Sequence, residues 1–317
     1  MQLFAAWNAW LGKRMFLLAL VALALGFVVP ISDSPSLRVG VIALFAYMTF
    51  VTALETSMRQ FARVLSRPWI PLWALALVHI VTPLIAWGVG YLFFPDDANI
   101  RTGYLISASI PVGVTSIIWT SLTQGDVAVS LVTVTLDTLI VPVLLPFFFM
   151  LTVGKSLAID YGQMAWQLLW MITIPSLAGM LLHDVTDGKA AAFSKGFGGV
   201  TSKIAFSSVI LINAALVVPA MSWNVSVLKM ALVTLFLVVL AYAIGYWGSF
   251  AVPNRTREIT LAMIYNVGLR NISSGLVLAL THFPPQVAVP MTLFILYQQP
   301  LASLVPYVFK HLEKAQS

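Results

Sequence analysis

Two short polar stretches interrupt long apolar segments of this 317-residue chain, and they are where its residues could do chemistry. The first covers residues 111–116 and reads Pro-Val-Gly-Val-Thr-Ser; the second covers residues 266–271 and reads Asn-Val-Gly-Leu-Arg-Asn. Unwound backbone inside a membrane offers N–H and C=O groups to a solute, so paired interruptions of this kind indicate a solute-binding site. The candidate binding residues are Pro111, Gly113, Thr115, Ser116, Asn266, Gly268, Arg270 and Asn271.

Asp137 and Arg270 are the two full charges that fall deep inside apolar segments. A charge at the centre of a bilayer costs at least about 2.5–3.5 kcal/mol on insertion scales, so each needs a polar cavity or a partner. Asn266 and Arg270 share one helical face, and Ser130 and Asp137 share another. If both faces line one cavity, Asp137 and Arg270 form a buried pair, which either serves the solute site or only locks helix packing. The permanent positive charge of Arg270 favours an anionic solute.

His79 is a third candidate for coupling chemistry, because it lies in the middle of an apolar segment, just before Thr82. One interpretation is a histidine satisfied by hydrogen bonds between helices. The other is a proton-coupling site, because histidine titrates near neutral pH. We therefore group His79 with Asp137 and Arg270 as candidate coupling residues.

The composition is typical of a polytopic helical membrane protein. Hydrophobic residues make up 60% of the chain and charged residues only 9%, whereas soluble domains carry about 25% charged residues. The absence of cysteine excludes disulfides, thiolate metal sites and a cysteine nucleophile. No nucleotide-binding loop, serine-hydrolase elbow or zinc-protease motif occurs, so the sequence does not predict an enzyme.

Ten apolar segments approach the length needed to cross a bilayer, about 20 apolar residues. Basic residues between them follow the positive-inside rule, so the net charge of +6 does not indicate nucleic-acid binding. We predict a multi-pass protein of the cell (inner) membrane with both termini cytoplasmic. The segments are residues 15–31, 37–56, 69–94, 102–123, 126–151, 163–183, 203–221, 226–251, 257–281 and 286–309. The basic residues assigned to the cytoplasmic side are Lys13, Arg14, Arg59, Arg63, Arg67, Lys189, Lys195, Lys203, Arg255, Arg257, Lys310 and Lys314, and those assigned to the outer side are Arg38, Arg101, Lys155 and Lys229.

The two halves of this all-α chain share an order of features. The interruptions fall in the fourth and ninth segments, and each is followed by a Val-Ala-Val run and then by a proline, Pro146 or Pro306. Five segments make up each half, so equivalent segments cross the membrane in opposite directions. This predicts two inverted repeats, residues 1–155 and residues 156–317. The alternative is chance similarity between two stretches rich in valine and glycine.

Specific motifs resemble the bile acid:sodium symporter family. Residues 65–68 (Leu-Ser-Arg-Pro) open the third segment, and residues 111–146 and 257–276 follow the family's pattern. The family's Gly-Asn-Val-Ala-Leu-Ser is matched by Gly-Asp-Val-Ala-Val-Ser at residues 125–130. Its Glu-Val-Gly-Met-Gln-Asn is matched by Asn-Val-Gly-Leu-Arg-Asn, and its Ser-Gly-Leu by residues 274–276.

The resemblance implies a fold and an activity. The fold is ten transmembrane helices, with a core domain of helices 3–5 and 8–10, a panel domain of helices 1, 2, 6 and 7, and broken helices 4 and 9 that cross. The activity is transport of an organic anion. The expected partners are that small organic anion and the lipid bilayer, with no nucleic acid.

The positions that hold sodium in that family are mostly changed here. Arg270 puts a positive charge where one cation would lie, and two like charges ~4 Å apart repel by about 4 kcal/mol at an effective dielectric of 20. A bound sodium ion is therefore doubtful, and no other metal or cofactor is expected. The carried-over positions are Val78, Ile117, Val134, Arg270 and the three that keep a ligand oxygen, Ser116, Ser130 and Asn266.

These observations favour a secondary transporter of a small or amphipathic organic anion, with weak or no sodium dependence. One alternative is an oxyanion exporter related to arsenite carriers, although a carrier of trivalent arsenic is expected to use a cysteine thiolate. Another is an ordinary sodium symporter with relocated ion sites. A membrane sensor or intramembrane enzyme is disfavoured, because no acid, base and nucleophile set occurs.

Overall fold

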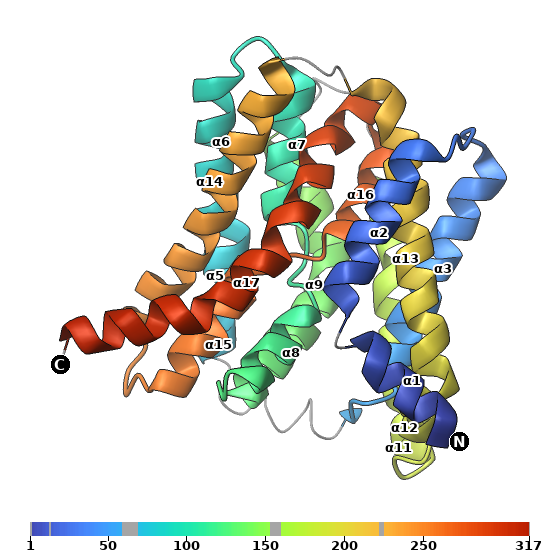
Figure 1. Cartoon of the computed structure of the whole chain (residues 1–317), viewed down its shortest axis with the longest axis vertical. Helices are drawn as coiled ribbons and strands as arrows, with labels where there is room; N and C mark the ends of the chain where they lie inside the picture. The colour runs from blue at the N-terminus through green and yellow to red at the C-terminus, as the bar shows by residue number, and fades with distance from the viewer. Residues whose placement is uncertain (1, 13, 59–68, 153–159, 222–224, 317) are drawn as a thin grey trace. The chain divides into compact units, whose positions relative to one another are not determined.

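The computed structural model describes residues 2–12, 14–58, 69–152, 160–221 and 225–316, which are predominantly helical (Figure 1). Within these ranges the one β-type pairing is an isolated antiparallel bridge between Val112 and Arg270. The motif at residues 65–68, the repeat boundary after residue 155 and the basic residues Lys13, Arg59, Arg63, Arg67 and Lys155 lie outside the described ranges.

The chain divides into two compact units. The first lies within Met1–Ser66, Thr138–Met221 and Ser273–Val289, and the second within Arg67–Asp137, Ser222–Ile272 and Pro290–Ser317. Three of the boundaries fall inside helices, namely α9 (Val127–Thr152), α16 (Ile272–His282) and α17 (Ala288–Gln316). The division into core and panel domains and the inverted repeats stay predictions.

The first unit is built around α13, which packs against α1, α2 and α3, while α11 packs against α3. Small residues permit the closest approaches between helices. A Cβ atom built on Gly26 would lie 2.5 Å from the Cβ of Ala214, and one built on Gly179 would lie 2.7 Å from the carbonyl oxygen of Phe50. The elements that lie wholly in this unit are α1 (Gln2–Gly12), α2 (Met15–Val28), α3 (Pro35–Ala53), α10 (Tyr161–Leu168), the π-helical turn η2 (Leu169–Thr173), α11 (Ile174–Val185), α12 (Ala191–Lys195), α13 (Phe197–Val217), η3 (Val218–Ala220) and η5 (Pro285–Val287).

The second unit holds both interrupted stretches. In it α14 packs along α15 and α6 packs along α7. Side-chain oxygens of Asp97, Asp126 and Thr256 accept backbone N–H groups at the starts of α7, α9 and α15, which satisfies donors that a helix leaves free. The elements that lie wholly in this unit are α5 (Trp69–Ala76), the π-helical turn η1 (Leu77–Val81), α6 (Thr82–Phe93), α7 (Ala98–Ser109), α8 (Thr115–Leu122), α14 (Val225–Gly248), η4 (Ser249–Ala251) and α15 (Arg257–Gly268).

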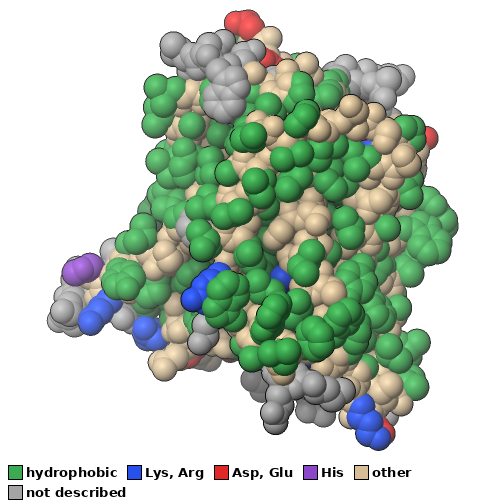
Figure 2. Space-filling view, turned by 45° about the vertical axis from the view of Figure 1, so that its right-hand side comes forward, with side chains coloured by type: hydrophobic (Ala, Val, Ile, Leu, Met, Phe, Trp, Pro, Cys, Tyr) green, Lys and Arg blue, Asp and Glu red, His purple; other side chains and the backbone are tan. Residues whose placement is uncertain are grey.

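Seven described helices are long and apolar enough to cross a membrane, or eight if the bent pair Leu3–Gly12 and Leu17–Val28 is one span. The seven correspond to predicted segments two, three, five to eight and ten. Apolar side chains cover much of the face visible in Figure 2, as expected of a surface that meets lipid. The seven are Pro35–Ala53, Trp69–Phe93, Val127–Leu151, Tyr161–Val185, Phe197–Val217, Ser226–Ala251 and Pro285–His311.

The predicted interruptions of segments four and nine are confirmed, with shifted limits. The first separates α7, which ends at Ser109, from α8, which begins at Thr115. The second separates α15, which ends at Gly268, from α16, which begins at Ile272. Both are shorter than the predicted 111–116 and 266–271. The reason is local, because the Ser116 amide already bonds to the Gly113 carbonyl at 2.9 Å, and helical bonding continues through α15 to its last residue.

Candidate functional site at the crossing of two interrupted helices

The two interruptions are joined to each other by backbone hydrogen bonds. The Gly113 amide donates to the Leu269 carbonyl at 2.9 Å, and the Asn271 amide donates to the Pro111 carbonyl at 2.8 Å. These bonds flank the Val112–Arg270 bridge. Each interruption therefore satisfies backbone groups that the other leaves unpaired, which is the condition for unwound backbone at membrane depth.

Gly113 and Gly268 keep this crossing compact. A Cβ atom on Gly113 would lie 3.1 Å from the Arg270 carbonyl oxygen, and one on Gly268 would lie 2.2 Å from the Tyr242 ring. Both glycines are buried. A side chain at either position would press on a neighbour. That these two glycines take part in binding a solute stays a prediction.

Arg270 is buried and is held by neutral groups. Its Nη2 atom donates to the Thr82 hydroxyl at 2.7 Å and to the Val78 carbonyl at 3.4 Å, and its backbone amide donates to Oε1 of Gln298 at 3.2 Å. Its Nη1 atom is buried and has no hydrogen-bond partner among the described residues. The side chain thus keeps a positive charge and one unused donor inside the protein.

Asp137 pairs with His79, so the predicted direct pair of Asp137 with Arg270 needs correction. Its Oδ1 atom lies 2.6 Å from Nε2 of His79, and its Oδ2 atom accepts the Val112 amide at 2.6 Å. Within the described ranges no ion pair within 4.0 Å joins Asp137 to Arg270. The physical reason is that the interruption frees the Val112 amide, and this amide together with the imidazole occupies both carboxylate oxygens.

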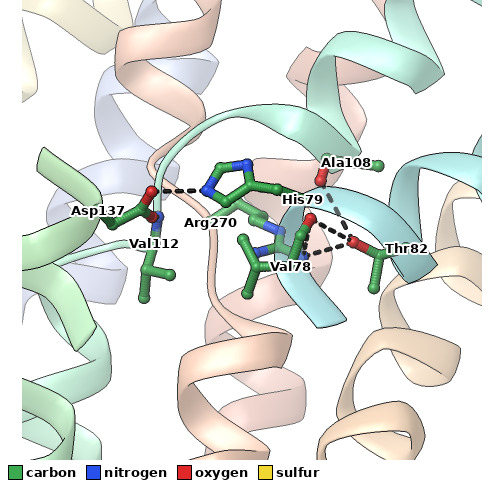
Figure 3. A network of polar contacts seen from close by, with 7 residues as sticks. All are labelled: Val78, His79, Thr82, Ala108, Val112, Asp137 and Arg270. Atoms are coloured by element: carbon green, nitrogen blue, oxygen red, sulfur yellow. Dashed lines mark hydrogen bonds and ion pairs between the residues drawn. The ribbon is translucent and has the colours of Figure 1, made fainter. Parts of the chain in front are cut away.

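Figure 3 shows these groups gathered around the crossing, with His79 beside Asp137 and Thr82 beside the guanidinium. His79 and Asp137 are both buried. The interpretation of His79 as a histidine satisfied between helices is supported by its contact with α9. Its coupling role stays a prediction.

A small cavity of about 20 Å³ lies beside Arg270, which is enough for about one water molecule. Its polar lining residues are Thr82, Ser107, Arg270 and Gln298. The Nε2 atom of Gln298 is buried and, like Nη1 of Arg270, lacks a hydrogen-bond partner in the described part of the chain. Two residues with unused donors therefore line one cavity.

Sequence reasoning missed the contribution of α17 and of Thr82. Gln298 bonds to the backbone of Arg270, and the Gln299 amide nitrogen donates to the Thr115 hydroxyl at 3.3 Å. The adjacent glutamines Gln298 and Gln299, next to Pro300 in an otherwise apolar segment, were a signal that could have identified this contribution. Thr115 thus contacts the tenth predicted segment.

The three positions that keep a sodium-ligand oxygen have unequal surroundings. The hydroxyl of Ser116 and both side-chain polar atoms of Asn266 are buried with no hydrogen-bond partner among the described residues. The hydroxyl of Ser130 lies 2.9 Å from that of Thr120 and shares a hydrogen bond with it. Oxygen atoms without partners remain at Ser116 and Asn266 alone of these three.

The positions that have lost an oxygen belong to an apolar cluster. Val78 and Val134 are buried in a cluster that includes Val112 and Met263, and Ile117 packs against it. A cation transferred into apolar surroundings loses its hydration without gaining ligands, which is strongly unfavourable. The cluster therefore fills space that the resemblance assigns to ion ligands.

Comparisons with known proteins agree with the resemblance. Residues 41–222 match the model of the Sodium Bile acid symporter family. The chain is 34% identical to the "Uncharacterized protein YbaS" of Bacillus subtilis (strain 168) over 85% of this chain and 88% of that protein. It is 26% identical to the "Uncharacterized sodium-dependent transporter YocS" of the same organism, over 96% of this chain and 94% of the relative.

A plant relative is more distant. The "Probable sodium/metabolite cotransporter BASS2, chloroplastic" of Oryza sativa subsp. japonica is 23% identical over 77% of this chain and 57% of that protein. The family match covers more than half of the 317 residues, and the described part has at least seven helices able to span a membrane. This multi-pass membrane protein is a transporter rather than an enzyme, and it belongs to the sodium bile acid symporter family.

Proposed function

We propose that this protein is a secondary transporter of a small or amphipathic organic anion, with little or no dependence on sodium. The observation that carries the proposal is the buried guanidinium of Arg270 at the crossing, whose Nη1 atom has no partner within the described ranges. Guanidinium and amide nitrogen donors match the acceptor oxygens of a carboxylate or sulfonate. Gln298 supplies a second such donor at the same cavity.

The weak sodium dependence rests on two features of the crossing. Arg270 is a permanent cation at a position that holds a sodium ligand in the resembled family, and its charge would repel a nearby sodium ion. Val78 and Val134, which replace further ligands, are buried in an apolar cluster. Both features lower the affinity for a cation at this place.

The membrane architecture completes the proposal. We count α7 with α8 and α15 with α16 as two broken spans, because neither pair contains a helix of the length needed to cross alone. Added to the eight spans that include the bent N-terminal pair, they give ten. The two halves then form inverted repeats, and both termini lie in the cytoplasm of a cell whose inner membrane holds the protein.

A sodium symporter with relocated ion sites is the second candidate. The names of two relatives favour it, since they describe a sodium-dependent transporter and a probable sodium/metabolite cotransporter. The side-chain oxygens of Ser116 and Asn266, which have no hydrogen-bond partner in the described part of the chain, are compatible with it. An oxyanion exporter of the arsenite type gains no support, because the chain has no cysteine.

Uptake into proteoliposomes tests the proposal. The purified protein is reconstituted and offered a panel of radiolabelled carboxylates and sulfonates, with sodium, potassium or choline as the only external cation. We expect saturable uptake of at least one organic anion at similar rates in all three salts, above that of protein-free vesicles. Uptake only in sodium would favour the second candidate, and no uptake of any organic anion would overturn both.

A further inference from the structure

The contact between His79 and Asp137 joins two titratable side chains inside the second unit. The residue His79 is 8% exposed and Asp137 is 0% exposed, and Nε2 of His79 lies 2.6 Å from Oδ1 of Asp137. Buried histidine and carboxylate groups at membrane depth are the residue types that hold and pass protons in transporters. A histidine beside a carboxylate can exist neutral or protonated near neutral pH.

This pair is attached to the crossing through backbone and side-chain contacts. The second oxygen of Asp137 accepts the amide of Val112, whose bridge partner is Arg270. On the other side, His79 lies in the π-helical turn η1, and Val78 and Thr82 next to it accept hydrogen bonds from the Arg270 guanidinium. Short π-helical turns often occur at functional sites. A change in the charge of the pair therefore acts directly on the groups that hold Arg270.

Few other charges surround the pair. The elements packed against η1 include α5, α6, α7, α14 and α15, and α9 contacts it through Asp137, the one charged residue of that helix. The buried tyrosines of α7, α14 and α15 are uncharged at neutral pH and donate their hydroxyls to backbone carbonyls, which leaves Arg270 as the nearby permanent charge. The tyrosines are Tyr104, Tyr242 and Tyr265; the charged residues of these helices, Arg101, Lys229, Arg257 and Glu258, lie toward their ends and are exposed or half-buried.

The charge balance of these side chains favours the binding of a proton together with the anion. When the carboxylate of Asp137 is ionised and the imidazole of His79 is neutral, the net charge of these two side chains and the Arg270 guanidinium is zero. A monovalent anion beside Arg270 would leave one uncompensated negative charge in a region of low dielectric, which is costly. One proton on the imidazole restores the balance. When Nε2–H donates to Asp137, that proton comes from water and binds Nδ1.

We propose that the His79–Asp137 pair takes up one proton when the organic anion binds and releases it when the anion leaves, so that transport is proton-coupled symport. This inference rests on the proposed function and adds the coupling ion. The proton enters from water on the side where the anion binds, converts the imidazole to imidazolium, and returns to water on the other side. No sodium ion is required in this cycle.

The test uses taurocholate as the probe, because its sulfonate stays ionised and carries no proton itself. Proteoliposomes that enclose a pH-sensitive dye are placed in sodium-free potassium buffer with valinomycin. Taurocholate uptake and proton entry are measured together. We expect a ratio near one proton per taurocholate, and about tenfold accumulation for an inward pH gradient of one unit at zero membrane potential.

Two variants and a control separate coupling from folding. His79→Gln keeps an amide donor near Asp137 but cannot take up the proton, and Asp137→Asn keeps the shape of the carboxylate. We expect both variants to lose proton entry and the accumulation of taurocholate that the pH gradient drives. In at least one of them, taurocholate should still enter down its own concentration gradient. His282→Gln, at a second histidine, the last residue of α16, should behave as the wild type.

The outcomes distinguish this inference from the proposed function. Sodium-free taurocholate uptake with no proton entry would overturn proton coupling and leave the transporter assignment standing. Unchanged proton coupling in both variants would also overturn it. Uptake of no organic anion in the wider panel would overturn the proposed function and this inference together.

Discussion

Val112 and Arg270 pair across the two interrupted helices, so the one charged side chain of the crossing lies on the backbone that links both interruptions. The flanking amides of Gly113 and Asn271 donate to the opposite stretch on either side of this pair. The guanidinium position is therefore fixed by both stretches together. A displacement of either interruption would move the charge that we assign to anion binding.

Glycine substitutions test the crossing. Gly268→Ala should be the more damaging change, because its Cβ would lie 2.2 Å from the buried ring of Tyr242, whereas that of Gly113→Ala would lie 3.1 Å from a backbone oxygen. Overpacking of this kind costs about 1–3 kcal/mol. We expect both variants to have a lower melting temperature in detergent and a lower uptake rate than the wild type. Both decreases should be larger for Gly268→Ala than for Gly113→Ala.

Gly88→Ala is the matched control, because a Cβ there would meet no neighbouring atom of the described residues within 4 Å. It should melt and transport like the wild type. Equal behaviour of all three variants would show that close packing at the crossing is not required.

The sequence predicted the interruptions because Pro111, Gly113 and Gly268 disfavour a continuous apolar helix. It did not predict their exact limits, which depend on where local helical bonding stops and resumes. It also did not predict the bonds that join the two stretches, such as Gly113 to Leu269, because they link residues more than 150 positions apart. Such bonds leave no local pattern in the chain.

Substitution of Arg270 separates binding from structural support. Arg270→Ala removes the donors and the charge, and a hydrogen bond to a charged group contributes about 1.5–3 kcal/mol, so the Kd for the anion should rise roughly tenfold or more. Arg270→Lys keeps the charge but not the forked donors, so we expect a smaller loss. Titration calorimetry on purified protein measures both.

Arg257→Ala serves as the control for this series, because Arg257 is an exposed arginine at the start of α15, the helix that precedes the interruption holding Arg270. Its affinity should match that of the wild type. If Arg270→Ala expresses poorly but the surviving protein binds with unchanged affinity, Arg270 is only a structural support.

A double substitution should create sodium dependence. Arg270→Gln with Asn266→Glu restores two ligand types of the resembled family and removes the positive charge. The gain should be partial, because Val78 and Val134 stay in the apolar cluster and cannot supply oxygens. The uptake rate should rise with sodium concentration in the double variant and should not change with it in Arg270→Gln alone. An uptake rate independent of sodium in both variants would count against the proposed correspondence of ion sites.

The partner of Asp137 could not be predicted from the sequence. Helical spacing placed Ser130 and Asp137 on one face and Asn266 and Arg270 on another, but spacing does not say which faces meet. The Val112 amide, freed by the interruption, and His79 occupy the carboxylate. A backbone donor has no signature in the side-chain sequence, which is why the pair with Arg270 was predicted instead.

Reporter fusions test the membrane topology. A reporter inserted at Gly188, in the turn between α11 and α12, should read cytoplasmic, and one at Asp97, between α6 and α7, should read external. The reason is the excess of basic residues on the cytoplasmic side. A cytoplasmic signal at Asp97 would contradict the ten-span arrangement.

We propose that the fixed charge of Arg270 takes the place of a bound cation. The most direct test is the affinity of the wild-type protein for its best organic anion, measured by titration calorimetry in sodium and in potassium buffers of equal ionic strength. We predict the same Kd in both buffers. An affinity that rises steeply with sodium would contradict the account and identify an ordinary sodium symporter with relocated ion sites.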